Sequence, residues 1–107
     1  MKPLDLVGEL LLSEKNDIEE VRKKIEKVTL EIFSSCEKRL QLSKKMGEIK
    51  ASKGIPVENE QVERELKDKV LEQCRKQGLD ERFCSKLLQL LLEESKRVQR
   101  NIAKSHS

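Results

Sequence analysis

The stretch DIEEVRKKIEKVTLEIFSSCEKRLQLSKKMGEIKASK, residues 17–53, decides the fold. Apolar residues recur in it at helical steps of three and four, and nothing stops the pattern before Gly54 and Pro56. These apolar residues are Ile18, Val21, Ile25, Val28, Ile32, Cys36, Leu40 and Met46. Asp17 and Glu20 form a capping pair, which predicts that the helix begins there. A helix of about 36 residues measures roughly 54 Å at 1.5 Å per residue.

A helix of this length is far longer than a small domain is wide. The residues that follow Gly54 are too few to cover its middle and its end. Only 36% of the 107 residues are apolar and 40% are charged, so one chain cannot build a thick core. Chains with so small a core gain burial by oligomerising. We therefore expect a partner chain to pack against the long helix.

Two further helices are expected after the long one. Residues 54–58 (GIPVE) form a breaker loop, and Asn59 is a good N-cap for a second helix. Gly78 supplies the stop of that helix, and Asp80 caps a third one that continues to about residue 103. The buried stripe of the second helix comprises Val62, Leu66, Val70 and Cys74. That of the third comprises Phe83, Leu87, Leu88, Leu91 and Leu92. Since no stretch alternates like a strand, the fold class is all-α, with one long and two shorter helices.

Residues 1–16 are interpreted as an N-terminal extension of unknown role, and residues 17–104 as the helical domain. The run PLDLVGELLL at 3–12 is apolar, but Asp5, Gly8 and Glu9 interrupt it and no small-residue cleavage site follows. It is also too short to span a bilayer. We expect a short amphipathic helix or turn there, a cytoplasmic location and no membrane partner.

The residues that metal sites and nucleophilic catalysis need are scarce. Cys36, Cys74 and Cys84 are odd in number and too widely spaced for a metal knuckle or a CxxC redox pair. They are interpreted as small apolar fillers in a reducing cytoplasm. The one histidine, His106, lies in a polar tail. We therefore expect no metal, no cofactor and no Ser-His or Cys-His catalysis.

The charges argue against a nucleic-acid partner. A net charge of +3 arises from 23 basic and 20 acidic residues, which are interspersed along the chain. Nucleic-acid binders usually carry a basic stripe or arm, often with aromatic residues for stacking. This sequence has only two aromatic residues that could stack on bases, Phe33 and Phe83. A solvated helix surface explains these charges better.

Some polar residues interrupt the apolar stripes and are candidates for chemistry. Leu92, Ser95 and Gln99 follow one another at steps of three and four, so a hydroxyl and an amide continue the buried face of the third helix. Arg39 and Lys50 are eleven residues apart, about 20° around a helix axis at 100° per residue. Two such cations could close on an anion of metabolite size from both ends. A fraying helix end and a solvated face remain the ordinary alternatives.

From Val21 to Gln99, about three-quarters of its length, the chain resembles the all-helical class of chorismate mutases. The matching segments are VRKKI at 21–25, EKRLQLSKKMGEIK at 37–50, GIPV at 54–57, GLDERF at 78–83 and LLQLLLEESKRVQ at 87–99. They occur in the family's order and at its spacing. The resemblance implies an intertwined helical homodimer that turns chorismate into prephenate, in aromatic amino-acid biosynthesis, without a cofactor.

The resemblance also implies a site made from two chains. Arg39 resembles the arginine that clamps a substrate carboxylate from the same chain, and Arg22 the one that enters the partner's site. Helix geometry supports this division. The two arginines are seventeen residues apart, roughly 26 Å along one helix and about 100° around it. They could not share one small ligand unless Arg22 came from another chain.

The other site residues implied by the resemblance surround the reacting bond and the ring. Lys50 resembles the lysine that reaches a carboxylate and the ether oxygen, and Gln99 the amide that donates to that oxygen. Ser95 matches a contact on the carboxylate side. Asn59 and Glu63 fall where the family holds the ring hydroxyl.

One departure from the family concerns the second helix. The family often has arginine immediately before the hydroxyl-binding glutamate, and this chain has Val62 there. A two-residue slip to Arg64 and Glu65 would restore the pair. Glu63 is preferred, because it lies about 40° from the centre of the apolar stripe and Glu65 about 120° away.

Two other functions remain open at this point. One is a lyase on the same fold that eliminates pyruvate from isochorismate, which product analysis would distinguish. The other is a helical adaptor or nucleic-acid-binding dimer, which would show strong salt dependence and would leave Ser95 and Gln99 unexplained.

Overall fold

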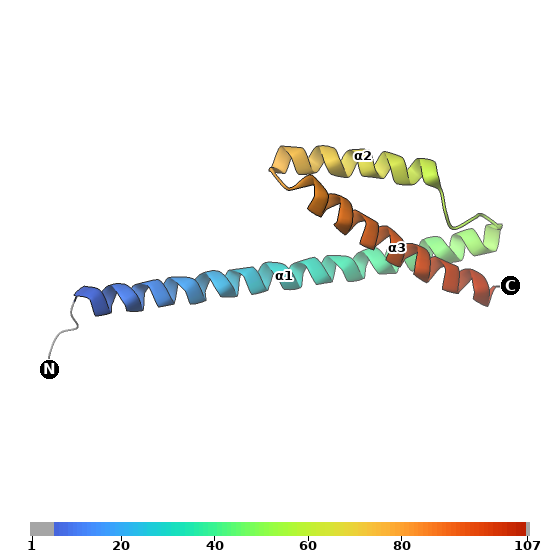
Figure 1. The fold of residues 1–107 in the computed structure, drawn as a ribbon. Helices are drawn as coiled ribbons and strands as arrows, with labels where there is room; N and C mark the ends of the chain where they lie inside the picture. The colour runs from blue at the N-terminus through green and yellow to red at the C-terminus, as the bar shows by residue number, and fades with distance from the viewer. Residues whose placement is uncertain (1–5, 107) are drawn as a thin grey trace. The chain divides into compact units, whose positions relative to one another are not determined.

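The computed structural model describes residues 6–106, with side chains from Glu14 onward. Three helices make up this part of the chain: α1 (Leu6–Lys53), α2 (Glu60–Gln77) and α3 (Glu81–Ser105), as Figure 1 shows. No strand occurs among the described residues. The all-α prediction, with one long and two shorter helices, is confirmed. None of the described helices is both long enough and apolar enough to cross a membrane.

The predicted beginning of the long helix is wrong. α1 starts at Leu6 and passes through Asp17 and Glu20 without a break. Residues 6–16 include four leucines, two glutamates and one lysine, which favour the helical conformation, so the helix continues upstream of the capping pair. A capping pair is effective only where a non-helical residue precedes it. The predicted division into residues 1–16 and 17–104 stays a prediction, and residues 1–5 lie outside the described part.

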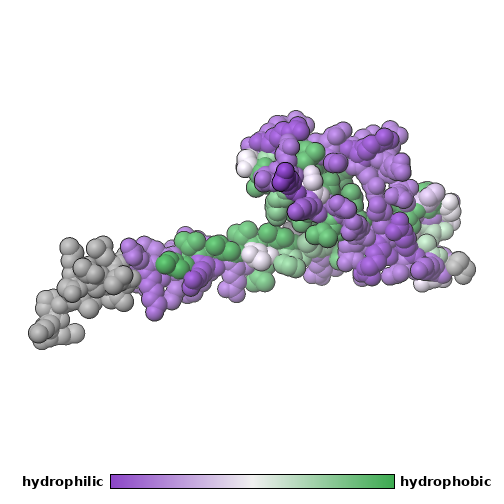
Figure 2. Space-filling model, in the orientation of Figure 1, coloured by the Kyte–Doolittle hydropathy of each residue, from purple (hydrophilic) through white to green (hydrophobic). Residues whose placement is uncertain are grey.

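The chain divides into two compact units, Met1–Ser35 and Cys36–Ser107. In the first unit, the described apolar side chains of α1 are each more than half exposed. They are Ile18, Val21, Ile25, Val28, Leu30, Ile32 and Phe33. Figure 2 shows hydrophobic residues along this part of α1. No other described element of the unit covers them, as expected of a helix that lacks an apolar neighbour.

In the second unit, local chemistry fixes where the helices end. Asn59 Oδ1 accepts a hydrogen bond from the Val62 backbone N–H at 3.2 Å, and Asp80 Oδ1 accepts one from Phe83 N–H at 3.0 Å. Gly78 ends α2 in the left-handed conformation, with φ of 70°. The Leu79 N–H then donates to the Cys74 carbonyl at 2.9 Å. The predicted caps and stop of α2 and α3 are confirmed.

The core of the second unit is small and partly polar. Its buried residues are Cys74, Cys84, Leu88 and Val98, together with the polar Ser43, Ser95 and Gln99. Three residues predicted as buried are instead exposed in the single chain. Val62 and Phe83 are more than half exposed, and Leu87 is 39% exposed. Each helix buries a narrower face than the predicted stripes, because only two neighbouring helices lie in the unit to cover it.

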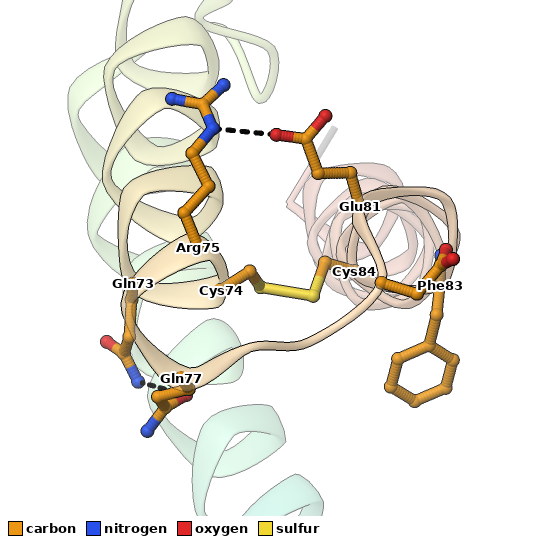
Figure 3. The surroundings of a disulfide bond; sticks show 8 residues. Gln73, Cys74, Arg75, Gln77, Glu81, Phe83 and Cys84 are labelled. Carbon is orange, nitrogen blue, oxygen red and sulfur yellow. Dashed lines mark hydrogen bonds and ion pairs between the residues drawn. A yellow bond between two sulfur atoms is a disulfide. The ribbon is translucent and has the colours of Figure 1, made fainter.

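The interpretation of Cys74 and Cys84 as apolar fillers is wrong. They form a disulfide between α2 and α3, with Cα atoms 6.7 Å apart (Figure 3). The tight α2–α3 turn brings them together, although ten positions separate them in sequence. Beside the disulfide, Arg75 Nε donates to Glu81 Oε1 at 2.6 Å. Cys36 is a free, half-buried thiol, and its predicted role as an apolar filler stays a prediction.

Candidate active site

A pocket of about 330 Å³ in the second unit contains six of the seven residues predicted for the site. These six are Arg39, Lys50, Asn59, Glu63, Ser95 and Gln99. Its apolar lining comprises Leu42, Met46, Val57, Val62, Leu66 and Leu92, and Ser43 and Lys96 complete it. We call it the active-site pocket. All three helices and the α1–α2 loop contribute to it, so residues distant in sequence converge here.

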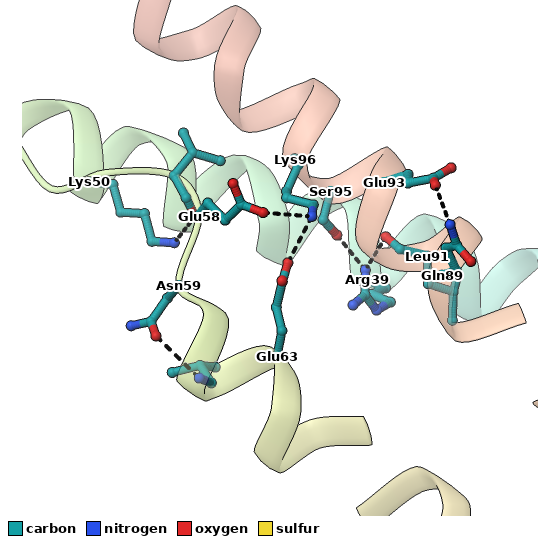
Figure 4. Close-up of polar contacts among 12 residues, drawn as sticks. Arg39, Lys50, Glu58, Asn59, Glu63, Gln89, Leu91, Glu93, Ser95 and Lys96 are labelled. Carbon is teal, nitrogen blue, oxygen red and sulfur yellow. Dashed lines mark hydrogen bonds and ion pairs between the residues drawn. The ribbon is translucent and has the colours of Figure 1, made fainter. Parts of the chain in front are cut away.

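The Arg39 side chain is anchored to α3. Its Nη1 donates to the Leu91 carbonyl oxygen at 2.9 Å and makes a short hydrogen bond to Ser95 Oγ (Figure 4). Ser95 Oγ also shares a hydrogen bond with the buried Ser43 Oγ at 2.7 Å. A guanidinium has five N–H donors in a rigid fork. The anchored nitrogen leaves the rest of the fork available to a carboxylate, the anion that guanidinium binds best.

Lys50 lies in the last turn of α1, which ends at the left-handed Gly54. Its Nζ donates to the Val57 carbonyl oxygen in the α1–α2 loop at 2.8 Å. The ammonium group has three donors, so this bond orients it and leaves others for a ligand. The loop therefore holds the second cation of the pocket.

Gln99 lines the pocket from α3, and Gly47 on α1 makes room for it. Gln99 is 7% exposed, and its Oε1 is buried without a hydrogen-bond partner, the one such side-chain atom found among the described residues. A Cβ atom on Gly47 would lie 3.2 Å from the Gln99 Cα and 3.1 Å from its Cγ. Glycine thus permits a close approach of α1 and α3 here. Sequence analysis did not identify Gly47.

Glu63, and not Glu65, lies in the pocket. Glu63 Oε1 is 3.0 Å from Lys96 Nζ, whereas Glu65 is exposed and accepts a hydrogen bond from Gln61 at 3.3 Å. The angular argument for Glu63 therefore agrees with its position. Asn59 lies at the same end of the pocket, where its oxygen is used in capping α2.

Lys96 is a pocket residue that sequence analysis missed. Its Nζ also lies 3.4 Å from Glu58 Oε1. The hydrogen bond to Glu63 raises the pKa of Lys96 above its ordinary value of 10.5, with the charge of Glu63 and the contacts with Glu58 adding to the effect and burial opposing it. Its spacing gave a signal, since it follows Leu92 by four positions and precedes Gln99 by three, on the buried face.

Arg22 lies in the first unit, on α1, with an exposed side chain. It is not among the residues that line the active-site pocket. Its predicted place in a partner's site stays a prediction. The described residues contain no group of His, Cys, Asp and Glu suited to a metal ion.

Comparison with known proteins agrees with the resemblance. A family model described as "Chorismate mutase type II" matches residues 21–100. The chorismate mutase of Methanocaldococcus jannaschii is 32% identical over 81 residues, which are 76% of this chain and 82% of that protein. No solved structure gives a significant match. The chain therefore belongs to the type II chorismate mutase family.

Family membership defines an isomerase that converts chorismate into prephenate, a step in aromatic amino-acid biosynthesis. The predicted family and activity are confirmed. Neither the lyase nor the adaptor alternative is favoured by these matches.

Proposed function

We propose that the chain works as an intertwined homodimer, in which each active site combines the active-site pocket of one chain with Arg22 of the other. The exposed apolar residues along α1 in the first unit support a partner chain, because an uncovered stripe of this length is unfavourable in water. The distance along one helix between Arg22 and Arg39 supports the shared site.

The proposed mechanism is orientation together with electrostatic stabilisation. The reaction is an intramolecular Claisen rearrangement, in which a C–C bond forms as the C–O ether bond breaks and no proton is transferred. Chorismate is a dianion that must fold into a compact chair-like shape. Arg39 from one chain and Arg22 from the other would hold its two carboxylates in that shape, which lowers the entropic part of the barrier.

Lys50 and Gln99 act on the ether oxygen. Negative charge grows on this oxygen as the C–O bond stretches, and donors already in place stabilise it without reorganisation. Each is worth about 3–4 kcal/mol by analogy with an oxyanion-hole donor. The observation that carries the proposal is the presence of Arg39, Lys50 and the buried carboxamide of Gln99 in one pocket.

Asn59, Glu63 and Ser95 complete the proposed substrate contacts. Glu63 and Asn59 bind the ring hydroxyl, and Ser95 makes a further contact on the side of the carboxylate that Arg39 binds. Ser95 already bonds to Arg39 and Ser43, so it helps to hold the Arg39 guanidinium in place.

The location that we propose is the cytoplasm, because a doubly charged metabolite does not cross membranes unaided. The Cys74–Cys84 disulfide is uncommon in that compartment. Intracellular proteins of heat-loving organisms are the known exception, and they are also rich in lysine and glutamate.

Gln99→Glu tests the role of the amide. An amide donates at any ordinary pH, whereas a carboxyl group donates only when it is protonated. The variant should be poor at neutral pH and should gain activity, relative to the parent protein, as the pH falls. The measurement is the loss of chorismate absorbance across the pH range, with prephenate identified as product. Parallel pH profiles would exclude Gln99 as the ether-oxygen donor.

Co-expression of Arg22→Ala and Arg39→Ala tests the shared site. Each variant alone should lose most of its activity. In a mixed dimer one site has both arginines intact and the other has neither. Random pairing makes about half of the dimers mixed, so roughly a quarter of all sites should be active. No recovery in dimers shown to be mixed would place Arg22 outside the partner's site.

A further inference from the structure

The Lys96 ammonium group pairs with two carboxylates, at the boundary between the active-site pocket and a second pocket. Figure 4 shows Glu58 and Glu63 reaching Lys96 from the α1–α2 loop and from α2. The side chains of Lys96 and Glu63 are only 21% and 25% exposed, whereas that of Glu58 is 50% exposed. The Glu63 contact is also the shorter one, at 3.0 Å against 3.4 Å. Lys96 therefore interacts mainly with Glu63, in a setting where water screens the pair less than at an open surface.

A second pocket, of about 480 Å³, lies against the same residues. Glu63, Leu92 and Lys96 line both pockets, so these three side chains separate them. Without Lys96, nothing in the described lining of the active-site pocket would hold the Glu63 carboxylate at its wall. The residue before Glu63 is the apolar Val62, which offers no charge to do so.

The charges that line the active-site pocket also support a role for Lys96 beside Glu63. Arg39, Lys50 and Lys96 are its cations and Glu63 is its one carboxylate. Within this chain, three positive charges against one negative leave an excess of two, and Arg22 of the partner chain would add to it in the proposed dimer, so the pocket is suited to a substrate with two carboxylates. Removal of Lys96 would leave Glu63 facing that dianion with its charge uncompensated, and like charges at short range repel.

We propose that Lys96 is a positioning residue of the reaction: it holds the Glu63 carboxylate at the pocket wall, where Glu63 accepts the hydrogen bond of the substrate's ring hydroxyl. This inference rests on the proposed role of Glu63. Lys96 does not touch the substrate and acts through Glu63 alone. The contact with the ring hydroxyl exists in both the bound substrate and the transition state, so its loss raises KM more than it lowers kcat.

The experiment compares Lys96→Met, Glu63→Gln and their double variant with the parent protein. Each single variant should lower kcat/KM by about tenfold, chiefly through KM, as expected for loss of a charge-assisted hydrogen bond. The double variant should be no worse than the single ones, because both disrupt one interaction. It also leaves no unpaired Glu63 charge, so it remains informative if Lys96→Met folds poorly. Lys96→Arg should restore most of the activity.

A substrate analogue with hydrogen in place of the ring hydroxyl provides a readout that a merely structural role would not change. With this analogue, Lys96→Met should lose much less kcat/KM than it loses with chorismate, because only the repulsion by the unpaired Glu63 charge remains. The matched control is Lys67→Met, since Lys67 is an exposed lysine that lines only the second pocket. Its activity with chorismate should equal that of the parent.

Three results would overturn the inference. The first is a Lys96→Met variant as active as Lys67→Met. The second is a double variant about a hundredfold weaker than the parent, the product of two independent losses. The third is an equal loss with the analogue and with chorismate. If Glu63→Gln alone has no effect while Arg39→Ala is inactive, the role of Glu63 fails and this inference with it. A parent protein that leaves chorismate unchanged would instead overturn the whole proposed function.

Discussion

The two units of this chain reach stability by different means. In Cys36–Ser107, a disulfide joins α2 and α3, side-chain caps fix where these two helices begin, the left-handed Gly78 ends α2, and Leu88 and Val98 are buried. In Met1–Ser35, the apolar side chains described on α1 are more than half exposed, and the ion pair found there is an exposed one, between Lys24 and Glu20 at 3.4 Å. Exposed pairs of this kind contribute little.

This difference indicates that the two units, which share α1, have different roles. The second unit holds the pocket and enough internal contacts to keep its residues in place. The first unit offers an apolar surface and one predicted site residue, Arg22, and in the proposed homodimer both would act on the partner chain. The first unit should therefore be sensitive to changes that block association, and the second to changes in its own packing.

The largest effect is expected from Ile25→Asp in the first unit. A carboxylate on the apolar stripe would have to be buried without a partner in the dimer, which is strongly unfavourable. The variant should sediment as a monomer and lose more than about tenfold in activity at submicromolar concentration, since folding and association are linked. The matched control is Lys27→Asp, which lies about 200° around the helix from Ile25. A dimeric, active Ile25→Asp protein would contradict the proposed interface.

A smaller effect is expected from removing the disulfide of the second unit. Cys74 and Cys84 are ten residues apart, and the chain-entropy model assigns a loop of this size about 3 kcal/mol of stabilisation. The double variant Cys74→Ser, Cys84→Ser should lose about that much in denaturant unfolding. A thiol reductant should do the same to the parent protein. Cys36→Ser should respond to reductant as the parent does, and equal stability of parent protein with and without reductant would exclude the bond.

Gly47→Ala tests the approach of α1 and α3 in the second unit. The new Cβ would press on the Gln99 backbone, so α3 must shift by a few tenths of an ångström. The strain costs roughly 1 kcal/mol or more, and the better helix propensity of alanine offsets up to about 1 kcal/mol. The stability should thus change little while kcat falls severalfold, because Gln99 moves. Glu48→Ala, at an exposed neighbouring position, should leave kcat unchanged. Unaltered kcat in Gly47→Ala would separate Gln99 from this contact.

The smallest effect is expected at alkaline pH. The pKa of Lys96 is raised above 10.5 in the folded protein, so the folded state retains its proton longer than the unfolded chain does. The stabilisation is fully present below about pH 10.5 and is lost as the pH rises through the folded pKa. Denaturant unfolding should show the advantage of the parent over Lys96→Met shrinking only above that pH. Lys96→Arg should keep its advantage there, because guanidinium stays charged.

Much of the second unit could be predicted because its signals are local. Asn59, Gly78 and Asp80 determine helix ends through bonds to residues three or four positions away. Periodicity placed Ser95 and Gln99 on the buried face, and the family resemblance supplied the roles. The predicted beginning of α1 was wrong, because a capping pair such as Asp17 and Glu20 can also occur in the interior of a helix.

What could not be predicted depends on how the chain folds back on itself. The α2–α3 turn brings Cys74 to Cys84, and no spacing rule for metal knuckles or redox pairs describes such a pair. Lys96 is one of many lysines in the sequence, and only the folded chain brings it to Glu63. Gly47 resembles any glycine in a helix until α3 is placed against it.

The stability of the fold and the proposed catalytic role make opposite demands on the buried carboxamide of Gln99. A polar atom kept from water without a partner costs the fold about 1–3 kcal/mol, so the protein is less sturdy than its shape would permit. An apolar side chain of similar size would relieve that cost and would abolish the donor to the ether oxygen. A laboratory selection for thermal endurance alone should therefore recover leucine or methionine at position 99, in proteins that withstand heating and no longer turn over chorismate.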